Sequence, residues 1–237
     1  MINEFADCYE CRHFSLNFFT DKPKIFHSEL RLEKPFHPAE LRSLKKIVSQ
    51  NNFESVSFHL AADYTNPIIC SDMFQPQGIK YNRDEIFSNV RINVRSLRES
   101  LPDGVVVSLE NNNYYPTGAY DTVTNTETIN QILCDNNIML LLDLAHLRIT
   151  AFNRGYDLFS YAETFLLDKV IQFHISGCRL ENGVMMDAHD EPDEIDWKLM
   201  VHLLNKCGDT RYVTLEYYRD IERLKVLNRK VSLLIKG

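Results

Sequence analysis

Residues 138–146 read IMLLLDLAH, an apolar run that ends in a carboxylate and is followed three residues later by a histidine. A run of branched apolar residues with no polar face is typical of a buried parallel strand. Similar runs recur along the chain, and a helical pattern follows most of them. The runs are residues 13–18 (HFSLNF), 25–30 (IFHSEL), 55–60 (SVSFHL), 105–110 (VVVSLE), 138–143 (IMLLLD), 170–175 (VIQFHI) and 212–217 (YVTLEY).

Amphipathic helical patterns separate these runs, over residues 38–48, 84–99, 127–134 and 196–204. Strands that alternate with helices form parallel, right-handed βαβ units. We therefore expect an α/β fold, a TIM (β/α)8-type barrel formed as one domain by residues 1–237, because about 250 residues suffice for that architecture. The eighth strand is weakest, near residues 231–235, so the barrel is expected to be irregular at its seam. An open doubly wound sheet is the second interpretation, although no phosphate-binding glycine motif follows the first strand.

The composition excludes several classes of protein. A net charge of -7 argues against a general nucleic-acid binder, which needs a basic face. The first residues show no signal peptide and no stretch is apolar enough to cross a membrane, so we expect a cytoplasmic protein without membrane contact. Its six cysteines are expected to be reduced thiols, and the pair Cys8-x-x-Cys11 lacks the second pair of a zinc site.

Polar residues lie at or near the carboxyl ends of most of these apolar runs. Those ends meet at one face of a parallel barrel, the face that carries the active site. A buried carboxylate or imidazole costs several kcal/mol unless it is paired or bound to a metal, so six such residues indicate metal ligands. They are His27, His59, Glu110, Asp143, His174 and Glu216.

Two short motifs extend this set. Asp143 and His146 form D-x-x-H at a strand-to-loop turn, and Asp187 and His189 form D-x-H in the loop that follows the His174 strand. Residues two apart in an extended segment point the same way. Nine candidate ligands exceed the four to six of one ion, so we expect two or three ions, with iron, zinc or manganese fitting these donors. His13, His37 and His202 are expected to have structural or surface roles.

Three stretches carry a resemblance to a known family. Residues 109–111 (LEN) with Tyr114, residues 141–157 (LLDLAHLRITAFNRGYD), and residues 172–177 (QFHISG) with 187–189 (DAH) resemble the multinuclear non-haem iron-dependent oxidative enzymes that include methanobactin-type biosynthetic proteins. That family lies within the xylose-isomerase-like barrel superfamily, whose metal-site order the nine residues follow. The chain departs from the family's pattern at Phe58, Cys178 and residues 152–155 (FNRG), which spares the proposed ligands and leaves the substrate open.

The resemblance implies a function. It implies two or three iron ions held by the nine ligands, and dioxygen-dependent oxidation of a side chain, usually cysteine, in a ribosomally made peptide. It implies a precursor peptide as substrate and a partner protein that delivers it. Asn111 and Asn153 are assigned to substrate contact or to support of the ligands.

Two other enzyme classes share parts of this pattern. A zinc-dependent phosphodiesterase of the endonuclease IV type uses the same ligand order, but the acidic balance disfavours DNA binding. A sugar isomerase or epimerase with one divalent metal needs fewer ligands than are present. Residues 68–81 read as a long irregular loop at the active face, either a lid, a substrate groove or plain surface.

Overall fold

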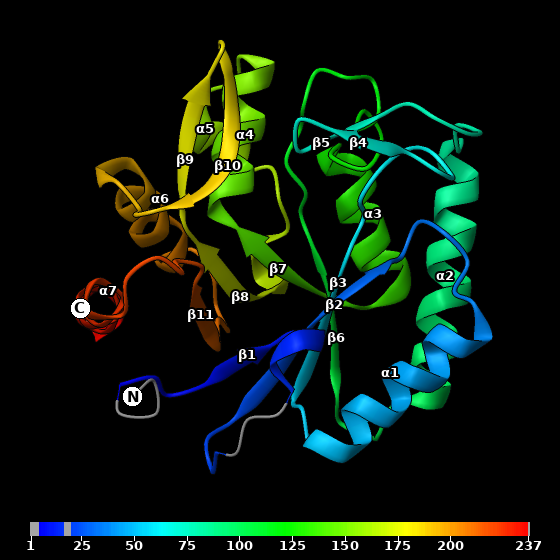
Figure 1. The fold of residues 1–237 in the computed structure, drawn as a ribbon, viewed down its shortest axis with the longest axis horizontal. Helices are drawn as coiled ribbons and strands as arrows, with labels where there is room; N and C mark the ends of the chain where they lie inside the picture. The colour runs from blue at the N-terminus through cyan, green and yellow to red at the C-terminus, as the bar shows by residue number, and fades with distance from the viewer. Residues whose placement is uncertain (1–4, 17–19, 237) are drawn as a thin grey trace. The chain divides into compact units, whose positions relative to one another are not determined.

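The computed structural model describes residues 5–16 and 20–236. The chain forms two compact units. The amino-terminal unit comprises Asp7–Glu110 and Pro116–Met139, and the carboxy-terminal unit comprises Met1–Ala6, Asn111–Tyr115 and Leu140–Gly237. Each unit alternates parallel strands with helices, as the sequence pattern predicts (Figure 1).

The amino-terminal unit contains a sheet of four parallel strands. Their order is β1 (Tyr9–Cys11), β2 (Lys24–Arg31), β3 (Ser55–His59) and β6 (Val106–Glu110). The register sets Ser57 beside His27 on one side and Ser108 on the other, and it sets His59 beside Glu110. The strands predicted over residues 25–30, 55–60 and 105–110 are confirmed.

The strand predicted over residues 13–18 is wrong. His13–Ser15 form a short 3-10 helix, and residues 17 and 18 lie outside the described residues. The strand that precedes β2 along the chain and pairs with it is β1. The hydroxyl of Ser15 accepts a hydrogen bond of 2.8 Å from the backbone N–H of Arg12. Such local side-chain bonds compete with a strand ladder, which explains why an apolar run here turns instead of extending.

Three helices complete the amino-terminal unit: α1 (Pro38–Asn51), α2 (Arg83–Ser100) and α3 (Thr126–Asn136). Each begins at a residue whose side chain accepts a backbone hydrogen bond in the first turn; these caps are His37, Asn82 and Asn125. Helix α1 packs on α2, and α2 packs on α3 (Figure 1). The three helices predicted in this unit are confirmed, and His37 is a capping residue as expected.

A small hairpin occupies the first part of residues 68–81. Strands β4 (Ile68–Cys70) and β5 (Met73–Gln75) pair antiparallel through a two-residue turn in which Ser71 and Asp72 both have positive φ. This is the turn that best fits the twist of a hairpin. The prediction of an irregular loop is therefore wrong for this part of the segment.

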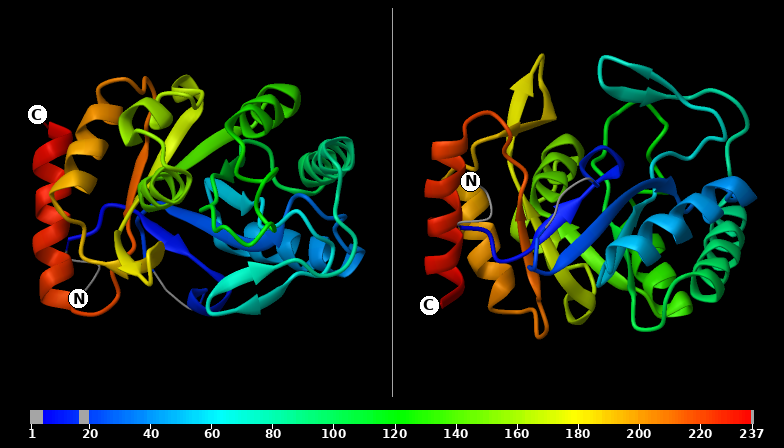
Figure 2. Two further views of the ribbon diagram at one scale, coloured as in Figure 1. Left: turned by 90° about the horizontal axis from the view of Figure 1, so that it is seen from above. Right: turned by 60° about the horizontal axis from the view of Figure 1, so that its bottom comes forward.

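Three parallel strands form the sheet of the carboxy-terminal unit, in the order β7 (Met139–Asp143), β8 (Val170–Ile175) and β11 (Tyr212–Leu215). All three correspond to predicted runs. Between β8 and β11 the chain forms an antiparallel hairpin of β9 (Gly177–Glu181) and β10 (Val184–Asp190), drawn in yellow in Figures 1 and 2. Strand β10 packs against the helix that follows β7.

Four helices belong to this unit: α4 (Leu144–Arg154), α5 (Leu158–Ala162), α6 (Glu194–Leu204) and α7 (Ile221–Lys236). The helix predicted over residues 196–204 is α6, and it lies beside α7 in both views of Figure 2. The strand predicted near residues 231–235 is wrong, because these residues belong to α7. Leu227 and Val231, four residues apart, are its buried side chains, so the apolar spacing there is helical.

No helix among residues 5–16 and 20–236 combines the length and the apolar character needed to span a membrane.

Candidate metal centre

Three predicted ligands come together in the amino-terminal unit. His27 lies on β2, and His59 and Glu110 are the last residues of the adjacent strands β3 and β6. Glu110 Oε2 lies 2.9 Å from His59 Nδ1 and 3.3 Å from His27 Nε2. One donor atom from each of the three residues lies within 4.8 Å of the others. We call His27, His59 and Glu110 the amino-terminal cluster.

Ser57 orients the most buried histidine of this cluster. Its hydroxyl oxygen lies 2.6 Å from Nδ1 of His27, and both residues are buried. That bond leaves Nε2 as the nitrogen that faces Glu110. The sequence analysis did not single out Ser57. The signal that could have found it is its position two residues before His59, on the same face of β3.

Six predicted ligands come together in the carboxy-terminal unit. His174 on β8 is the register neighbour of Asp143, the last residue of β7. Nδ1 of His174 lies 3.7 Å from Oδ2 of Asp143 and 3.5 Å from Oε1 of Glu216, which directly follows β11. The other three members are His146 on α4 and Asp187 and His189 on β10. We call these six residues the carboxy-terminal cluster.

The spacing D-x-x-H has a structural cause. Asp143 is the capping residue of α4, and its Oδ1 accepts a hydrogen bond of 2.8 Å from the backbone N–H of His146. The second oxygen, Oδ2, therefore remains directed at His174 and lies 3.8 Å from Nε2 of His146. The motif was predicted at a strand-to-loop turn; it marks a strand-to-helix turn instead.

Asp187 and His189 reach the cluster from the hairpin rather than from a loop. The ladder of β9 and β10 is irregular between Asp187 and Asp190, and His189 has a positive φ of 45°. Oδ2 of Asp187 lies 3.6 Å from His146 Nε2, and His189 Nε2 lies 3.2 Å from Glu216 Oε2. Glu216 thus has one oxygen near His174 and the other near His189.

Charge and burial shift the acid–base properties of these groups. Burial alone would raise the pKa of Asp187, but the hydrogen bond and charge of His146, with the charge of His189, hold that pKa below its usual value. The hydrogen bond to Glu216 raises the pKa of His189. Burial raises the pKa of the Cys178 thiol far above its usual value.

Asn111 and Asn153, predicted to contact substrate or support ligands, both bond to backbone groups. The buried amide of Asn111 donates to the carbonyl of Asp143 at 3.1 Å and accepts from its N–H at 2.7 Å. Its own carbonyl lies 2.8 Å from Nδ1 of His146. Asn153 joins α4 to β10 through the N–H and the carbonyl of Met185. These contacts favour a supporting role for both residues.

The donor atoms fit a bound metal. Ligands about 2.1 Å from an ion, set at tetrahedral or octahedral angles, lie about 3.0–3.4 Å from one another. The closest nitrogen–oxygen pairs of the two clusters lie 2.9 to 3.6 Å apart. Asp143, Glu110 and Glu216 are at most 3% exposed, and carboxylates this buried need a positive partner. Imidazole and carboxylate together suit iron, zinc and manganese.

The three remaining histidines lie elsewhere. The ring of His13 packs edge-on against Phe26, at 5.1 Å between ring centres. His202 on α6 lies 2.7 Å from a carboxylate oxygen of Glu163. His13 and His202 thus have ordinary structural partners, and His37 is the cap of α1 described above.

Solved structures define the class of fold. Superposition on a D-psicose 3-epimerase in the presence of D-fructose gives a TM-score of 0.64 at 13% identity, covering 100% of this chain and 92% of that chain. The IOLI protein with a zinc atom gives 0.63 at 14% identity, covering 99% and 87%. Likeness at this level of identity shows the fold, which is a TIM-type barrel, as predicted.

The sequence defines the family within that fold. Residues 28–235 match the family described as RiPP precursor modification enzyme MbnB/TglH/ChrH, in which RiPP denotes a ribosomally synthesised and post-translationally modified peptide. The chain belongs to this family, which confirms the resemblance. A UPF0276 protein of Vibrio parahaemolyticus is 27% identical over 93% of this chain and 89% of its own length.

Proposed function

We propose that this protein is an iron-dependent enzyme that uses dioxygen to oxidise a side chain, most simply cysteine, in a ribosomally synthesised peptide. Family membership supports the peptide substrate. The single observation that carries the metal dependence is that each of the nine predicted ligands lies beside other predicted ligands, with histidine nitrogens next to carboxylate oxygens.

The two clusters would hold two or three iron ions. His27, His59 and Glu110 would hold one, and the six residues of the carboxy-terminal cluster would hold the others. When bound, iron supplies redox capacity and a binding place for dioxygen and for the substrate's thiol. The chain supplies the geometry: Ser57 orients His27, and Asn111 fixes the backbone of Asp143.

We extend the proposal to the domain organisation, the partner and the metal. Residues 1–237 act as one catalytic domain, and a partner protein presents the precursor peptide. Asn153 supports the hairpin strand that carries Asp187 and His189. Zinc or manganese is the alternative metal, since the same donors bind them. Family membership favours peptide modification over the phosphodiesterase and the sugar isomerase.

A direct test uses short cysteine-containing peptides encoded beside the gene. Protein loaded with iron(II) without oxygen is mixed with each peptide and then exposed to air, and the peptide mass and oxygen consumption are followed. The proposal expects a mass change in one peptide, coupled to oxygen uptake, that zinc-loaded protein does not produce. Turnover with zinc, or a mass change that needs no oxygen, would contradict it.

A further inference from the structure

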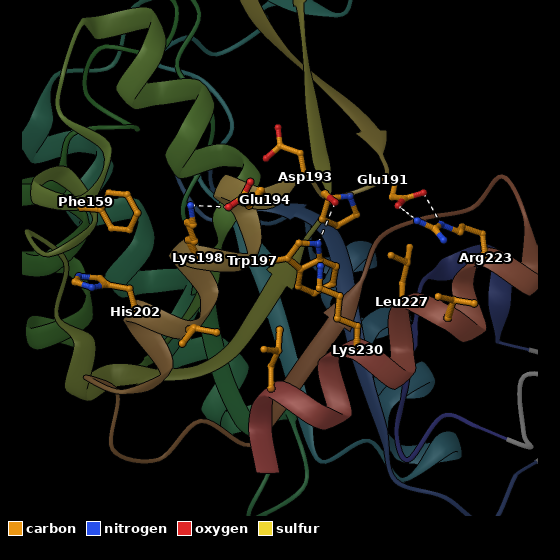
Figure 3. A pocket seen from close by; sticks show the side chains of 14 residues that line it. Phe159, Glu191, Asp193, Glu194, Trp197, Lys198, His202, Arg223, Leu227 and Lys230 are labelled. Atoms are coloured by element: carbon orange, nitrogen blue, oxygen red, sulfur yellow. Dashed lines mark hydrogen bonds and ion pairs between the residues drawn. The ribbon is translucent and has the colours of Figure 1, made fainter. Parts of the chain in front are cut away.

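A groove lies outside both clusters, in the carboxy-terminal unit. It has a volume of about 710 Å³ and is lined by parts of α5, α6 and α7 and by the segment that joins β10 to α6. Figure 3 shows its lining side chains, with Trp197 in the middle and Leu227 and Lys230 from α7 facing it. None of the nine proposed ligands lines it.

The floor of the groove is apolar and firmly held. The indole N–H of Trp197 donates to the carbonyl of Pro192 at 3.1 Å, and the residue is 6% exposed. Val201, Leu227 and Val226 add apolar side chains to the lining, and Val226 is 49% exposed. An apolar cavity with a fixed aromatic floor suits the side chains of an apolar ligand.

The charged groups around this floor differ in whether they form ion pairs within the protein. The carboxylates are engaged within the protein: Glu191 pairs with Arg223, Glu194 with Lys198, and Asp193 with Arg148. The ammonium group of Lys230 lies over the ring of Trp197, 4.3 Å from its centre. No ion pair among the described residues includes Lys230, and its charge acts on Glu191 and Glu194 only at longer range. A ligand carboxylate would give the exposed Lys230 a close ionic partner beside an apolar surface.

The groove lies close to the carboxy-terminal cluster along the chain. Glu191, at its rim, is two residues after His189, so their Cα atoms are no more than about 7 Å apart. The segment that carries Glu216 also leads directly into α7, and Arg219 in that segment donates to the carbonyl of Ala188. A chain seated in the groove would therefore need only a few residues to reach His189.

The size of the groove selects the kind of occupant. A stable interface with a folded protein engages roughly 20–30 residues on each side. This groove is lined by 14 residues, and its volume is that of a pocket for a small ligand or a few side chains. A short peptide segment fits these dimensions better than the face of a folded partner.

We propose that the groove binds a short segment of the precursor peptide, away from the residue that is modified, through apolar side chains against Trp197 and a carboxylate paired with Lys230. The occupant rests on the proposed function, since that function makes the substrate a peptide. The binding surface itself is independent of any metal.

The test begins with displayed random peptides of twelve residues, selected on the full chain and counter-selected on a Lys230→Glu variant. Enriched sequences should combine apolar residues with a neighbouring Asp or Glu. A synthetic copy of the best sequence is then titrated while the fluorescence of Trp197, the protein's single tryptophan, is recorded. A saturable change is expected, at least tenfold weaker in Lys230→Glu. Arg229→Glu is the matched control, because Arg229 is exposed on the same helix and does not line the groove.

Three results would overturn the proposal: enrichment without acidic residues, equal weakening by Lys230→Glu and Arg229→Glu, or absence of the enriched motif from the precursor peptides encoded beside the gene. The metal content distinguishes failure of the groove proposal from failure of the proposed function. Both variants should keep the wild-type metal content, and Glu216→Gln should keep peptide binding while losing metal. Absence of peptide binding by the wild-type chain with its metal bound would refute the groove, and absence of iron from a chain that binds the peptide would refute the iron-dependent function.

Discussion

The two clusters use the same kinds of donor atoms but are supported differently. The amino-terminal cluster stands on three adjacent strands of one sheet, and His27 and Glu110 are buried. The carboxy-terminal cluster adds a helix cap and an irregular hairpin strand, and the side chain of its member His189 is 37% exposed. The comparison teaches that one cluster is fixed by the sheet itself, whereas the other is completed by a hairpin that leaves it open to a substrate.

The largest expected effect comes from Glu216→Gln, because Glu216 has one oxygen near His174 and the other near His189. Removing its charge should eliminate the metal of the carboxy-terminal cluster and lower activity at least a hundredfold. Metal content by elemental analysis and turnover measure both effects. Glu222→Gln, an exposed position on α7, is the control and should change neither. Unchanged metal content in Glu216→Gln would remove this residue from the ligand set.

Glu110→Gln should lower the metal content, since Glu110 contacts both histidines of the amino-terminal cluster. The metal content should fall by about one ion per chain, with a tenfold or larger loss of turnover. Glu54→Gln, an exposed residue of the same unit, serves as control. Equal loss of all metal in both cluster variants would show that the two clusters do not load separately.

Ser57→Ala tests the orientation of His27 rather than a ligand. Loss of the 2.6 Å contact with Nδ1 should weaken metal binding by the amino-terminal cluster about tenfold, the lower end of the range for residues that orient ligands. Ser55→Ala on the same strand is a close control, because that buried hydroxyl bonds to the carbonyl of Val106. Metal titration of the two variants should separate them, and equal affinities would argue that Ser57 only fills space.

The two clusters should lose their metal to a chelator at different rates. The carboxy-terminal cluster, where the side chain of His189 is 37% exposed, should lose its metal faster to a soluble chelator than the amino-terminal cluster, where the most exposed side chain, His59, is 23% exposed. Wild-type protein should therefore release metal in two phases, and Glu216→Gln should show only the slower one. A single phase in both proteins would contradict the difference in support between the clusters.

Much of the fold could be predicted from the sequence, because buried parallel strands leave continuous apolar runs such as residues 138–143 and 170–175. The apolar pattern is misleading where the residue types favour a strand but the structure forms a helix or a turn. Residues 231–235 contain enough branched side chains for a strand, but Leu227 and Val231 lie on one helical face. Residues 13–15 form a turn because the hydroxyl of Ser15 bonds to the backbone, and apolar periodicity does not predict such a bond.

The candidate ligands were predictable for a different reason. Polar residues that end apolar strands have few roles other than binding, so His59, Glu110 and Asp143 stood out. The way Asp187 and His189 reach the cluster was not predictable, because it depends on a hairpin irregularity and on the positive φ of His189. Ser57 was missed because a hydroxyl on a strand is common, and its function appears only in the register with His27.

The most direct test of the account is the metal content of the full chain, purified without chelator and measured by elemental analysis. The account expects two or three ions per chain, predominantly iron, since the nine donors form clusters in both units. Zinc alone would keep the metal centre and contradict the oxidative chemistry. Less than one ion of any kind per chain, even after loading with iron(II), would contradict the central claim that these residues are metal ligands.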